Sequence, residues 1–384
     1  MNITFLKLYR TNELNGIFYN SQEVGLAKAL VKLHPEHHVD IILLSKKSEE
    51  LKKGVLAKKN TGCFGAEIKS VVISENINLH IFEAKGLGHH GIIDLSILKK
   101  MNTDLVHLLA DNMLYAPNVI NYCKKNGIKC HLYIGTLFTD SNKWYKRALG
   151  RLLMDRNIKA YRKTDVYVKT PFVKEQFKAF GIDAKLAPVG LNVSDTDLST
   201  ESRENIRNRF GLPSDRKILL FVGKLEEYKH PVEALELLIR LEGFHLLVVG
   251  KGTELSVIEK KADAMGMAGN ITILPKVPNS EMRDIFKACD YYINFNPVEI
   301  YGMAILEAMC HNCPVLAIKA PGPAFLIKDG VTGFICNDTE QMAEKISFLE
   351  KEKERYEKIQ LDAREYIINN LTWNKTVLKF EDFG

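Results

Sequence analysis

Short apolar segments alternate with longer amphipathic segments along most of this chain. In the first half, the apolar segments are residues 3–9, 39–44, 77–82, 104–109, 128–133 and 165–169. In the second half, they are residues 217–223, 244–250, 270–274, 290–295, 314–318 and 333–336. Several of these segments are apolar throughout, as expected for strands that helices cover on both faces. The pattern therefore predicts parallel sheets built from strand–helix–strand units.

A polar stretch at residues 192–209 separates the two series of apolar segments. It contains few apolar residues and many charges, so we interpret it as the connection between two domains. The alternation restarts after Pro213, and residues from Thr339 onward carry Lys and Glu at helical spacings, which predicts packed surface helices. The predicted fold class is α/β with two doubly wound sheets, and such sheets bind ligands at the carboxyl ends of their strands.

Length and composition place the chain among ordinary globular proteins. Its 384 residues, 46% of them apolar and 26% charged, exceed what one hydrophobic core usually holds. No apolar stretch approaches the roughly 18 residues of a membrane span, and the first residues lack a signal-peptide pattern. Seven scattered cysteines indicate free thiols in a reducing cytoplasm. The net charge of +6 is modest, and we expect no nucleic-acid partner from it.

Two glutamates in the second half, Glu299 and Glu307, bracket a glycine and an apolar run. The preceding residues 290–295 predict a strand, and residues 303–310 predict the first turns of a helix. Glu299 then lies on a strand-to-helix loop, and the unpaired N–H groups at the helix start suit a phosphate. A carboxylate on such a loop can accept hydrogen bonds from sugar hydroxyls. The spacing alone has little weight in a chain with 47 acidic residues.

This segment resembles the E-x7-E motif of retaining glycosyltransferases of family 4. The matching positions are Glu299, Tyr301, Gly302, Glu307, Ala308 and Met309. Ile300 replaces the usual proline. Upstream, residues 221–229 resemble the family's V-G-R-L-x-x-x-K segment, with Lys224 in place of arginine. Residues 248–254, 273–281 and 328–336 are similar to further family segments in the same order.

The resemblance implies roles for particular residues. The catalytic set is Lys224 and Lys229, which would grip the nucleotide diphosphate, and Glu299, which would orient the donor sugar. The residues implied in donor binding are Gly16, Gly223, Lys276, Val277, Gly302, Met303, Ala304 and Glu307. Among these, Glu307 would hold the ribose. Without the glutamate motif, the two lysines would be interpreted as solvated surface charge.

The same resemblance implies the GT-B architecture, in which two Rossmann-like domains face a deep cleft. The implied domains are an acceptor-binding domain at 1–195 and a nucleotide-sugar-binding domain at 196–365. A C-terminal helix at 366–384 would cross back and pack on the first domain.

The first domain departs from the family pattern. The strand at 128–133 usually ends in a His-Gly pair, and Gly135-Thr136 stands there instead. His107 and Asp111 are the acceptor-side candidates, although we favour a satisfied buried histidine for His107. Residues 143–163 predict a helix that is basic on one side and apolar on the other. It either lies on an anionic membrane surface or packs its apolar side on the core, and the sequence leaves both open.

The predicted function is transfer of a sugar from a nucleotide diphosphate donor, expected to be UDP-linked, to a hydroxyl with retention at the anomeric carbon. The resemblance implies a hexosyl- or N-acetylhexosaminyltransferase of bacterial surface polysaccharide or glycolipid assembly. We expect it to be cytoplasmic, with peripheral membrane contact through 143–163, and to need no cofactor or metal. One alternative is a catalytically inactive glycosyltransferase-like binding subunit. Another is a different GT-B enzyme, an epimerase or a phosphorylase.

Three further patterns suggest other chemistry but lack its context. Residues 86–91 satisfy the letter of the dinucleotide fingerprint, but they follow the third strand, so we expect a flexible loop. Cys310 and Cys313 form a lone CxxC and are interpreted as packing thiols. Asp195-Thr196-Asp197 imitates a metal-binding D-x-D but falls in the polar connection.

Overall fold

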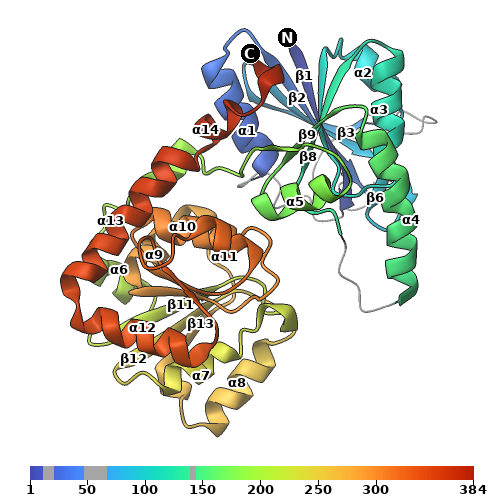
Figure 1. The fold of residues 1–384 in the computed structure, drawn as a ribbon. Coiled ribbons are helices and arrows are strands. Elements are labelled where there is room, and N and C mark those ends of the chain that lie inside the picture. The colour runs from blue at the N-terminus through green and yellow to red at the C-terminus, as the bar shows by residue number, and fades with distance from the viewer. Residues whose placement is uncertain (12–20, 47–66, 139–143) are drawn as a thin grey trace. The chain divides into compact units, whose positions relative to one another are not determined.

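The apolar segments of the sequence form the strands of two sheets in the computed structural model (Figure 1). The structure describes residues 1–11, 21–46, 67–138 and 144–384. These residues form two compact units, the first made of 1–190 with 373–384 and the second of 191–372. The predicted domains were 1–195, 196–365 and 366–384, and their limits lie near these divisions. That these limits separate independently folding domains stays a prediction.

The sheet of the first unit is parallel over most of its width. Its main strands are β1 (Asn2–Thr11), β2 (His38–Ser45), β3 (Glu67–Ser74), β4 (Ile77–Glu83), β7 (Leu105–Leu109), β8 (Lys129–Ile134), β9 (Asp165–Val168) and β10 (Lys185–Leu186). They follow the order β10-β9-β8-β7-β1-β2-β4-β3. Only β3 runs antiparallel to its neighbour β4 within this row of described strands. β3 was not predicted, because the predicted strands were continuous apolar runs. In β3, apolar and polar residues alternate, as they do in a half-exposed edge strand.

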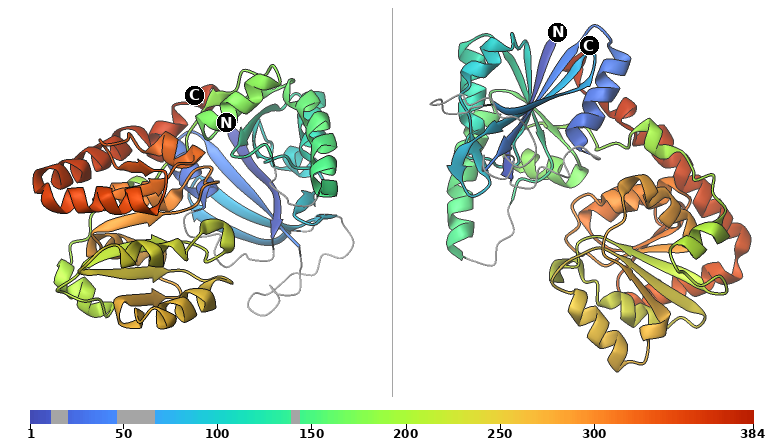
Figure 2. Two further views of the ribbon diagram at one scale, coloured as in Figure 1. Left: turned by 60° about the horizontal axis from the view of Figure 1, so that its bottom comes forward. Right: turned by 180° about the vertical axis from the view of Figure 1, so that it is seen from behind.

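Helices cover this sheet: α1 (Gln22–Leu33), α2 (Ser96–Lys100), α3 (Ala116–Lys125), α4 (Trp144–Tyr161) and α5 (Pro171–Ala179). Two of them begin at capping side chains, since Ser21 accepts a hydrogen bond from the Val24 N–H and Thr170 from the Val173 N–H. The last residues of the chain, α14 (Trp373–Val377) and a 3₁₀ turn at Glu381–Phe383, return to this unit, where α14 packs on α1. Both ends of the chain therefore lie on the first unit (Figure 2).

The glycine-rich segment at 86–91 is a β-hairpin, so the predicted flexible loop is wrong. β5 (Lys85–Leu87) and β6 (His90–Ile92) pair antiparallel, and β6 also pairs with β1. The Arg10 guanidinium holds the hairpin, because it donates to the carbonyl oxygens of Ala84, Gly86 and Gly88. This contact joins residues more than 70 positions apart, which no local pattern reveals.

The second unit, whose backbone is described throughout, has one six-stranded parallel sheet. Its strands are β11 (Lys217–Val222), β12 (Phe244–Val249), β13 (Ile271–Leu274), β14 (Tyr291–Asn294), β15 (Val315–Ile318) and β16 (Phe334–Cys336). They follow the order β13-β12-β11-β14-β15-β16. The α-helices are α6 (Arg203–Arg209), α7 (Glu233–Ile239), α8 (Leu255–Ala264), α9 (Met282–Ala288), α10 (Met303–Cys310), α11 (Pro321–Leu326), α12 (Thr339–Lys351) and α13 (Lys353–Asn370). All six predicted strands of this half are confirmed.

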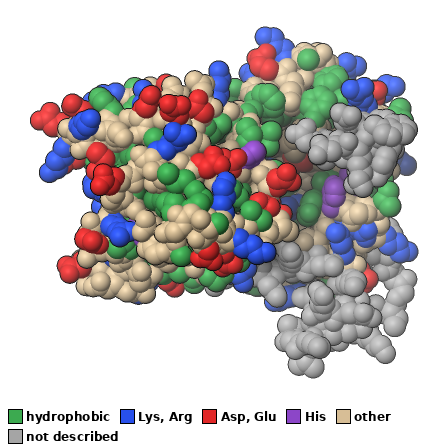
Figure 3. Space-filling view, turned by 90° about the horizontal axis from the view of Figure 1, so that it is seen from below, with side chains coloured by type: hydrophobic (Ala, Val, Ile, Leu, Met, Phe, Trp, Pro, Cys, Tyr) green, Lys and Arg blue, Asp and Glu red, His purple; other side chains and the backbone are tan. Residues whose placement is uncertain are grey.

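Two hydrophobic clusters in the second unit, one centred on β14 and α10 and the other on β12 and α7, bury alternate side chains of the same strands. This is why its strands are apolar throughout. Cys310 and Cys313 lie in the first cluster, and the six cysteines in the described ranges are free thiols, as predicted. On the face shown in Figure 3, acidic and basic side chains of the described residues are interspersed. No described helix has the length and apolar content that a membrane crossing requires.

Candidate functional site

The predicted strand, loop and helix around Glu299 are present. β14 ends at Asn294, and α10 begins at Met303, directly after Gly302. Gly302 has φ 97°, and a Cβ atom there would lie 2.8 Å from the Ile305 Cδ1 atom, so the turn into the helix requires glycine. The first N–H groups of α10 have no partner within the helix, and the helix dipole adds partial positive charge there. The helix start can therefore attract an anion.

Glu299 lies beside Lys229, so the structure brings together two of the residues named from the sequence. The Lys229 Nζ atom is 2.6 Å from the Glu299 Oε2 atom, and the Asn296 side chain donates to the same oxygen at 3.0 Å. Both charged side chains are only partly exposed, with 21% of the Lys229 side chain and 15% of the Glu299 side chain accessible. The carbonyl of Glu299 also accepts a hydrogen bond from the Gly322 N–H. Lys229 and Asn296 thus hold the carboxylate of Glu299, while Gly322 holds its backbone.

The loop after β11 places Lys229 and Lys224. Its Gly223 N–H donates to the Val249 carbonyl and its Leu225 N–H to the Lys251 carbonyl. The loop after β12 therefore packs backbone to backbone against it, and Lys224 stands exposed between the two. Within the part of the chain that the structure describes, no ion pair of Lys224 is found. An exposed lysine in that position is available to an anionic ligand.

Glu307 lies in the second turn of α10 and is half-buried. Burial, together with the negative charge of Asp195, raises the pKa of its carboxyl to about 7. Among the described residues, no cation lies within ion-pair distance of Glu307. Asp195, from the segment that imitates a D-x-D motif, is itself bonded to the Asn192 side chain at 2.7 Å. Near neutral pH, the protonated and ionised forms of the Glu307 carboxyl are therefore both populated.

Lys276 and Val277 follow β13, at the same edge of the sheet. The Leu274 carbonyl accepts a hydrogen bond from the Gly250 N–H, which joins this loop to the loop after β12. Lys276 is exposed and Val277 is buried. The carboxyl ends of β13, β12, β11 and β14 are neighbours in the sheet, so most expected donor residues share one edge. Gly16 lies outside the described residues.

In the first unit, Asp111 and Gly135 meet after β7 and β8. The Asp111 Oδ1 atom accepts the Gly135 N–H at 2.6 Å and the Thr136 N–H at 3.2 Å. The side chain of Lys169, just after β9, occupies the space beside Gly135: a Cβ atom there would lie 2.9 Å from its Cδ atom. The Lys169 side chain therefore lies next to residue 135, the position at which the resemblance leads one to expect a histidine.

Lys169 was not among the residues predicted from the sequence. Its Nζ atom donates to Gln22 at the start of α1 and lies 4.9 Å from the centre of the Tyr133 ring. Nearby in β1, Lys7 pairs with the buried Glu23 at 2.8 Å. The position of Lys169 in the sequence could have identified it, because a cation directly after a parallel strand lies at the ligand-binding edge of the sheet.

His107 is fully buried in β7, as a packed histidine would be. It lies among the rings of Phe5, Tyr133 and Phe383, and its Nδ1 atom is 2.7 Å from the Nε2 atom of His131. Burial, with the charges of His131 and Lys169, holds the pKa of His107 well below its usual value. This placement matches a histidine of the core, but the expected satisfied histidine is not fully realised, because its Nε2 atom has no hydrogen-bond partner among the described residues.

The amphipathic segment at 143–163 is only partly described. Its first residue and the side chains of 144–149 lie outside the described set. In the rest of α4, Asn157 donates to Asn112, and Arg156 donates to Asn118 in α3, so this half packs against the unit. Leu152 is 69% exposed. Contact with an anionic membrane through this segment stays a prediction.

One group of potential metal ligands is found among the described residues. Ligand atoms of His34, Glu36 and His37 lie within 4.8 Å of one another, in the turn between α1 and β2. The turn is at the amino-terminal edge of the sheet, opposite to Asp111 and Gly135. His37 donates from Nε2 to the Phe383 carbonyl at 2.8 Å, so the turn anchors the end of the chain.

Sequence comparison links the second unit to a known family. Residues 202–366 match the sequence profile of the family described as Glycosyl transferases group 1. The D-inositol 3-phosphate glycosyltransferase of Mycolicibacterium smegmatis is 31% identical over 145 residues, which cover 36% of this chain and 33% of that protein. The chain thus matches about a third of the length of its curated relatives.

Structural likeness extends over nearly the whole chain. HepE of Anabaena, solved with UDP, has a TM-score of 0.74 at 14% identity and covers 99% of this chain and 98% of its own. HepE was also solved with UDP-glucose. A glycosyltransferase from Rickettsia africae has a TM-score of 0.69 at 21% identity, covering 98% of this chain and 96% of its own. At these identities the matches show the fold, and the predicted GT-B class is confirmed.

Proposed function

We propose that this protein is a retaining glycosyltransferase that moves a sugar from a UDP-linked donor to a hydroxyl acceptor. The contact between Lys229 and Glu299 carries the proposal. It joins a cation on the loop after β11 to a carboxylate on the loop that leads into α10. The match of residues 202–366 to glycosyl transferases group 1 supports it. The complexes of HepE with UDP and UDP-glucose support the same donor class.

In this proposal, positive charge supplied by the protein stabilises the departing diphosphate. Lys224, Lys229 and the first N–H groups of α10 face the negative charge that develops as the sugar leaves. A lysine makes a point-charge contact and not the two-pronged contact of arginine. Because these groups supply the positive charge, we expect no metal requirement, and excess EDTA should leave turnover unchanged.

The two glutamates would bind hydroxyl groups. Glu299, already held by Lys229 and Asn296, would accept hydrogen bonds from the donor sugar, which we expect to be a hexose or N-acetylhexosamine. Glu307 would accept them from the ribose. Transfer with retention needs no protein base if the departing phosphate oxygen takes the acceptor's proton. Gly135 in place of a histidine is compatible with such a reaction.

We further propose that the acceptor is a sugar, glycolipid or polysaccharide of bacterial surface assembly. Asp111 and Lys169, which meet at Gly135, are the candidate acceptor-side groups of the first unit. Peripheral contact of residues 143–163 with an anionic membrane would bring a lipid-linked acceptor within reach.

A donor screen followed by turnover tests the proposal. Nucleotide diphosphates and nucleotide sugars are compared by thermal shift, since a true donor stabilises the fold by mass action. Nucleotide release is then measured with and without acceptors for the wild type, Glu299→Gln and the exposed control Glu227→Gln. We expect release by the wild type and the control, and its loss in Glu299→Gln.

The alternatives give different results. A binding subunit would be stabilised by the nucleotide but would release none with any donor, and this outcome would overturn the enzyme proposal. An epimerase would convert the donor without an acceptor, and a phosphorylase would need inorganic phosphate in its place.

A further inference from the structure

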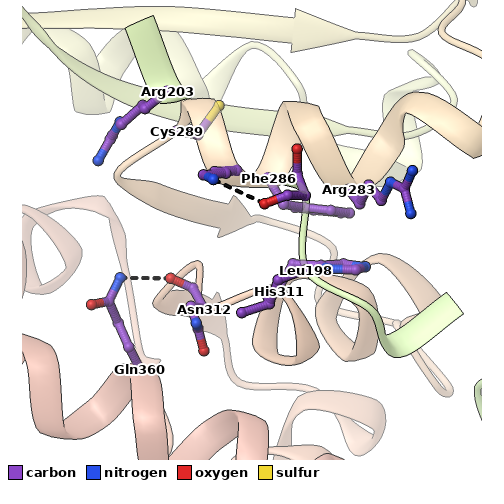
Figure 4. A pocket seen from close by; sticks show the side chains of 10 residues that line it. Leu198, Arg203, Arg283, Phe286, Cys289, His311, Asn312 and Gln360 are labelled. Carbon is purple, nitrogen blue, oxygen red and sulfur yellow. Dashed lines mark hydrogen bonds between the residues drawn. The ribbon is translucent and has the colours of Figure 1, made fainter. Parts of the chain in front are cut away.

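A pocket lies in the second unit, at the end of α10 away from Gly302. Its volume is about 260 Å³, and residues of the polar connection, α6, α9, α13 and the end of α10 line it. Figure 4 shows Arg203, His311, Asn312 and Gln360 around it. α10 has eight residues and is therefore about 12 Å long. The pocket is thus separate from the candidate donor site at the start of that helix.

Three polar atoms of this pocket lack hydrogen-bond partners. They are the His311 Nδ1, Asn312 Oδ1 and Arg203 Nε atoms, which are buried and, across the described residues, unpaired. His311 is only 8% exposed. An unpaired buried polar atom costs about 1–3 kcal/mol, so native structures rarely keep several together. A ligand that bonds these atoms would remove that cost.

The pocket is positively charged. Its lining includes Arg203, Arg283 and Lys287 and no carboxylate. Asp290, just behind it, lies 2.8 Å from Arg203 and 2.9 Å from Arg207, so one carboxylate is shared by two guanidinium groups. Arg283 lies 4.0 Å from the Asp284 carboxylate, at the limit of an ion pair. The cations of this region still outnumber these two carboxylates, and the remaining positive charge favours an anionic ligand.

His311 supplies a neutral polar contact. Burial, with the positive charges of Arg364 and Arg283, lowers the pKa of His311 to about 4. The ring is therefore neutral near pH 7, and its unpaired Nδ1 atom is the one that can bond a ligand. The backbone of its neighbour Asn312 is held by the Gln360 side chain, which donates to the Asn312 main-chain carbonyl at 2.6 Å. The unpaired Oδ1 atom of the Asn312 side chain can accept a hydrogen bond from a hydroxyl group.

We propose that this pocket binds a small phosphate ester that carries a free hydroxyl group, independently of the donor site. The anion accepts hydrogen bonds from Arg203 and faces Arg283, while the hydroxyl group donates to Asn312. The cavity is smaller than the roughly 300–1,000 Å³ of typical drug-sized sites, so the ligand has few carbon atoms. The inference does not depend on glycosyl transfer.

Titrations of the full-length protein test this inference. Glycerol 3-phosphate, inorganic phosphate and glycerol are added to protein labelled with ¹⁵N-histidine, and the His311 ring signal is assigned by its loss in His311→Leu. We expect glycerol 3-phosphate to shift that signal at saturable concentrations, phosphate to bind more weakly, and glycerol to have no effect.

Two variants probe the ligand contacts. Asn312→Gly should fold, since Asn312 has φ 57°, a backbone conformation that glycine adopts readily. We expect Asn312→Gly and Arg283→Met each to weaken glycerol 3-phosphate binding about tenfold, or ~1.4 kcal/mol. The matched controls, Asn102→Gly at φ 50° and the exposed Arg240→Met, should bind as the wild type does.

Three outcomes would overturn the inference. The first is no saturable shift with inorganic phosphate or glycerol 3-phosphate, and the second is unchanged affinity in both pocket variants. The third is equal affinity for phosphate and glycerol 3-phosphate, which would mean that the hydroxyl group makes no contact. Lys229→Met separates this test from the proposed function. That variant should lose nucleotide binding yet keep glycerol 3-phosphate binding, and joint loss would place the phosphate ester in the donor site.

Discussion

Glu307 keeps its proton at a pH where an exposed glutamate has released it. Burial and the charge of Asp195 raise its pKa from 4.5 to about 7. Between these two values the folded protein binds more protons at this carboxyl than the unfolded chain does. The free energy of unfolding therefore falls as the pH rises through that window.

Replacing Glu307 by glutamine should remove this pH dependence. We expect Glu307→Gln to raise the free energy of unfolding at pH 8 by on the order of 1–3 kcal/mol and to change it little at pH 4.5. Urea unfolding at the two pH values measures the effect. The exposed Glu344→Gln serves as control, and a gain that is equal at both pH values would show that ionisation of Glu307 is not its cause.

Donor affinity should follow the same ionisation, if Glu307 holds the ribose. Hydrogen bonding to hydroxyls is strongest for the carboxylate, so affinity for UDP-glucose should fall as the pH drops below about 7, by at most tenfold per unit. Calorimetric titration between pH 5.5 and 8 measures this. The donor is used in place of UDP, whose terminal phosphate titrates in the same range. In Glu307→Gln the slope should vanish, and a persistent slope would assign it to another group.

Lys229 and Glu299 should be energetically coupled. Their side chains are partly exposed, so the pair contributes about 1 kcal/mol and not the larger values of fully buried pairs. In a double-mutant cycle with Lys229→Met and Glu299→Gln, the double variant should lose less stability than the two single losses together. Urea unfolding provides the four values. Strict additivity would mean that the 2.6 Å contact contributes nothing to stability.

At the scale of elements, the loops after β11 and β12 are held together by glycine. A Cβ atom on Gly252 would lie 2.1 Å from the Leu225 carbonyl oxygen. This contact explains why the loop that carries Lys224 and Lys229 can pack so closely on its neighbour.

Gly252→Ala should therefore disturb the candidate donor site. We expect a loss of about 1–3 kcal/mol in the free energy of unfolding, because the new methyl group forces the two loops apart. UDP affinity, measured by calorimetry, should fall as well. Gly269→Ala is the matched control, since a Cβ atom there meets nothing within 4 Å. If both variants behave alike, backbone entropy and not loop contact determines the effect.

At the scale of the whole molecule, the last residues of the chain complete the core of the first unit. Phe383 is 1% exposed, and its ring centre lies 4.8 Å from that of Phe380 and 6.1 Å from that of Phe5 in β1. The carboxylate of Asp382 accepts a hydrogen bond from the buried His131 ring. The first unit thus requires both ends of the sequence.

Phe383→Ala should destabilise the first unit by about 3–5 kcal/mol, the usual cost of removing a buried aromatic ring. Phe348→Ala is the control, because Phe348 is 47% exposed and lies on α12. Its effect should stay within about 0.5 kcal/mol. Chemical unfolding of both variants gives the comparison, and a small loss in Phe383→Ala would mean that the C-terminal residues only cover the sheet.

The sequence by itself determined the strands, α10 and the candidate donor residues of the second unit. Strands that are buried on both faces appear in the sequence as continuous apolar runs. A glycine directly before a helix can likewise be recognised from the local sequence alone. Only the tertiary structure decided which distant groups meet, such as Lys229 with Glu299 and Lys169 with Gly135. It also decided that residues 86–91 pair as strands, because Arg10 binds their carbonyls. Such contacts depend on which distant segments the fold brings together. The periodicity of the sequence does not contain that information.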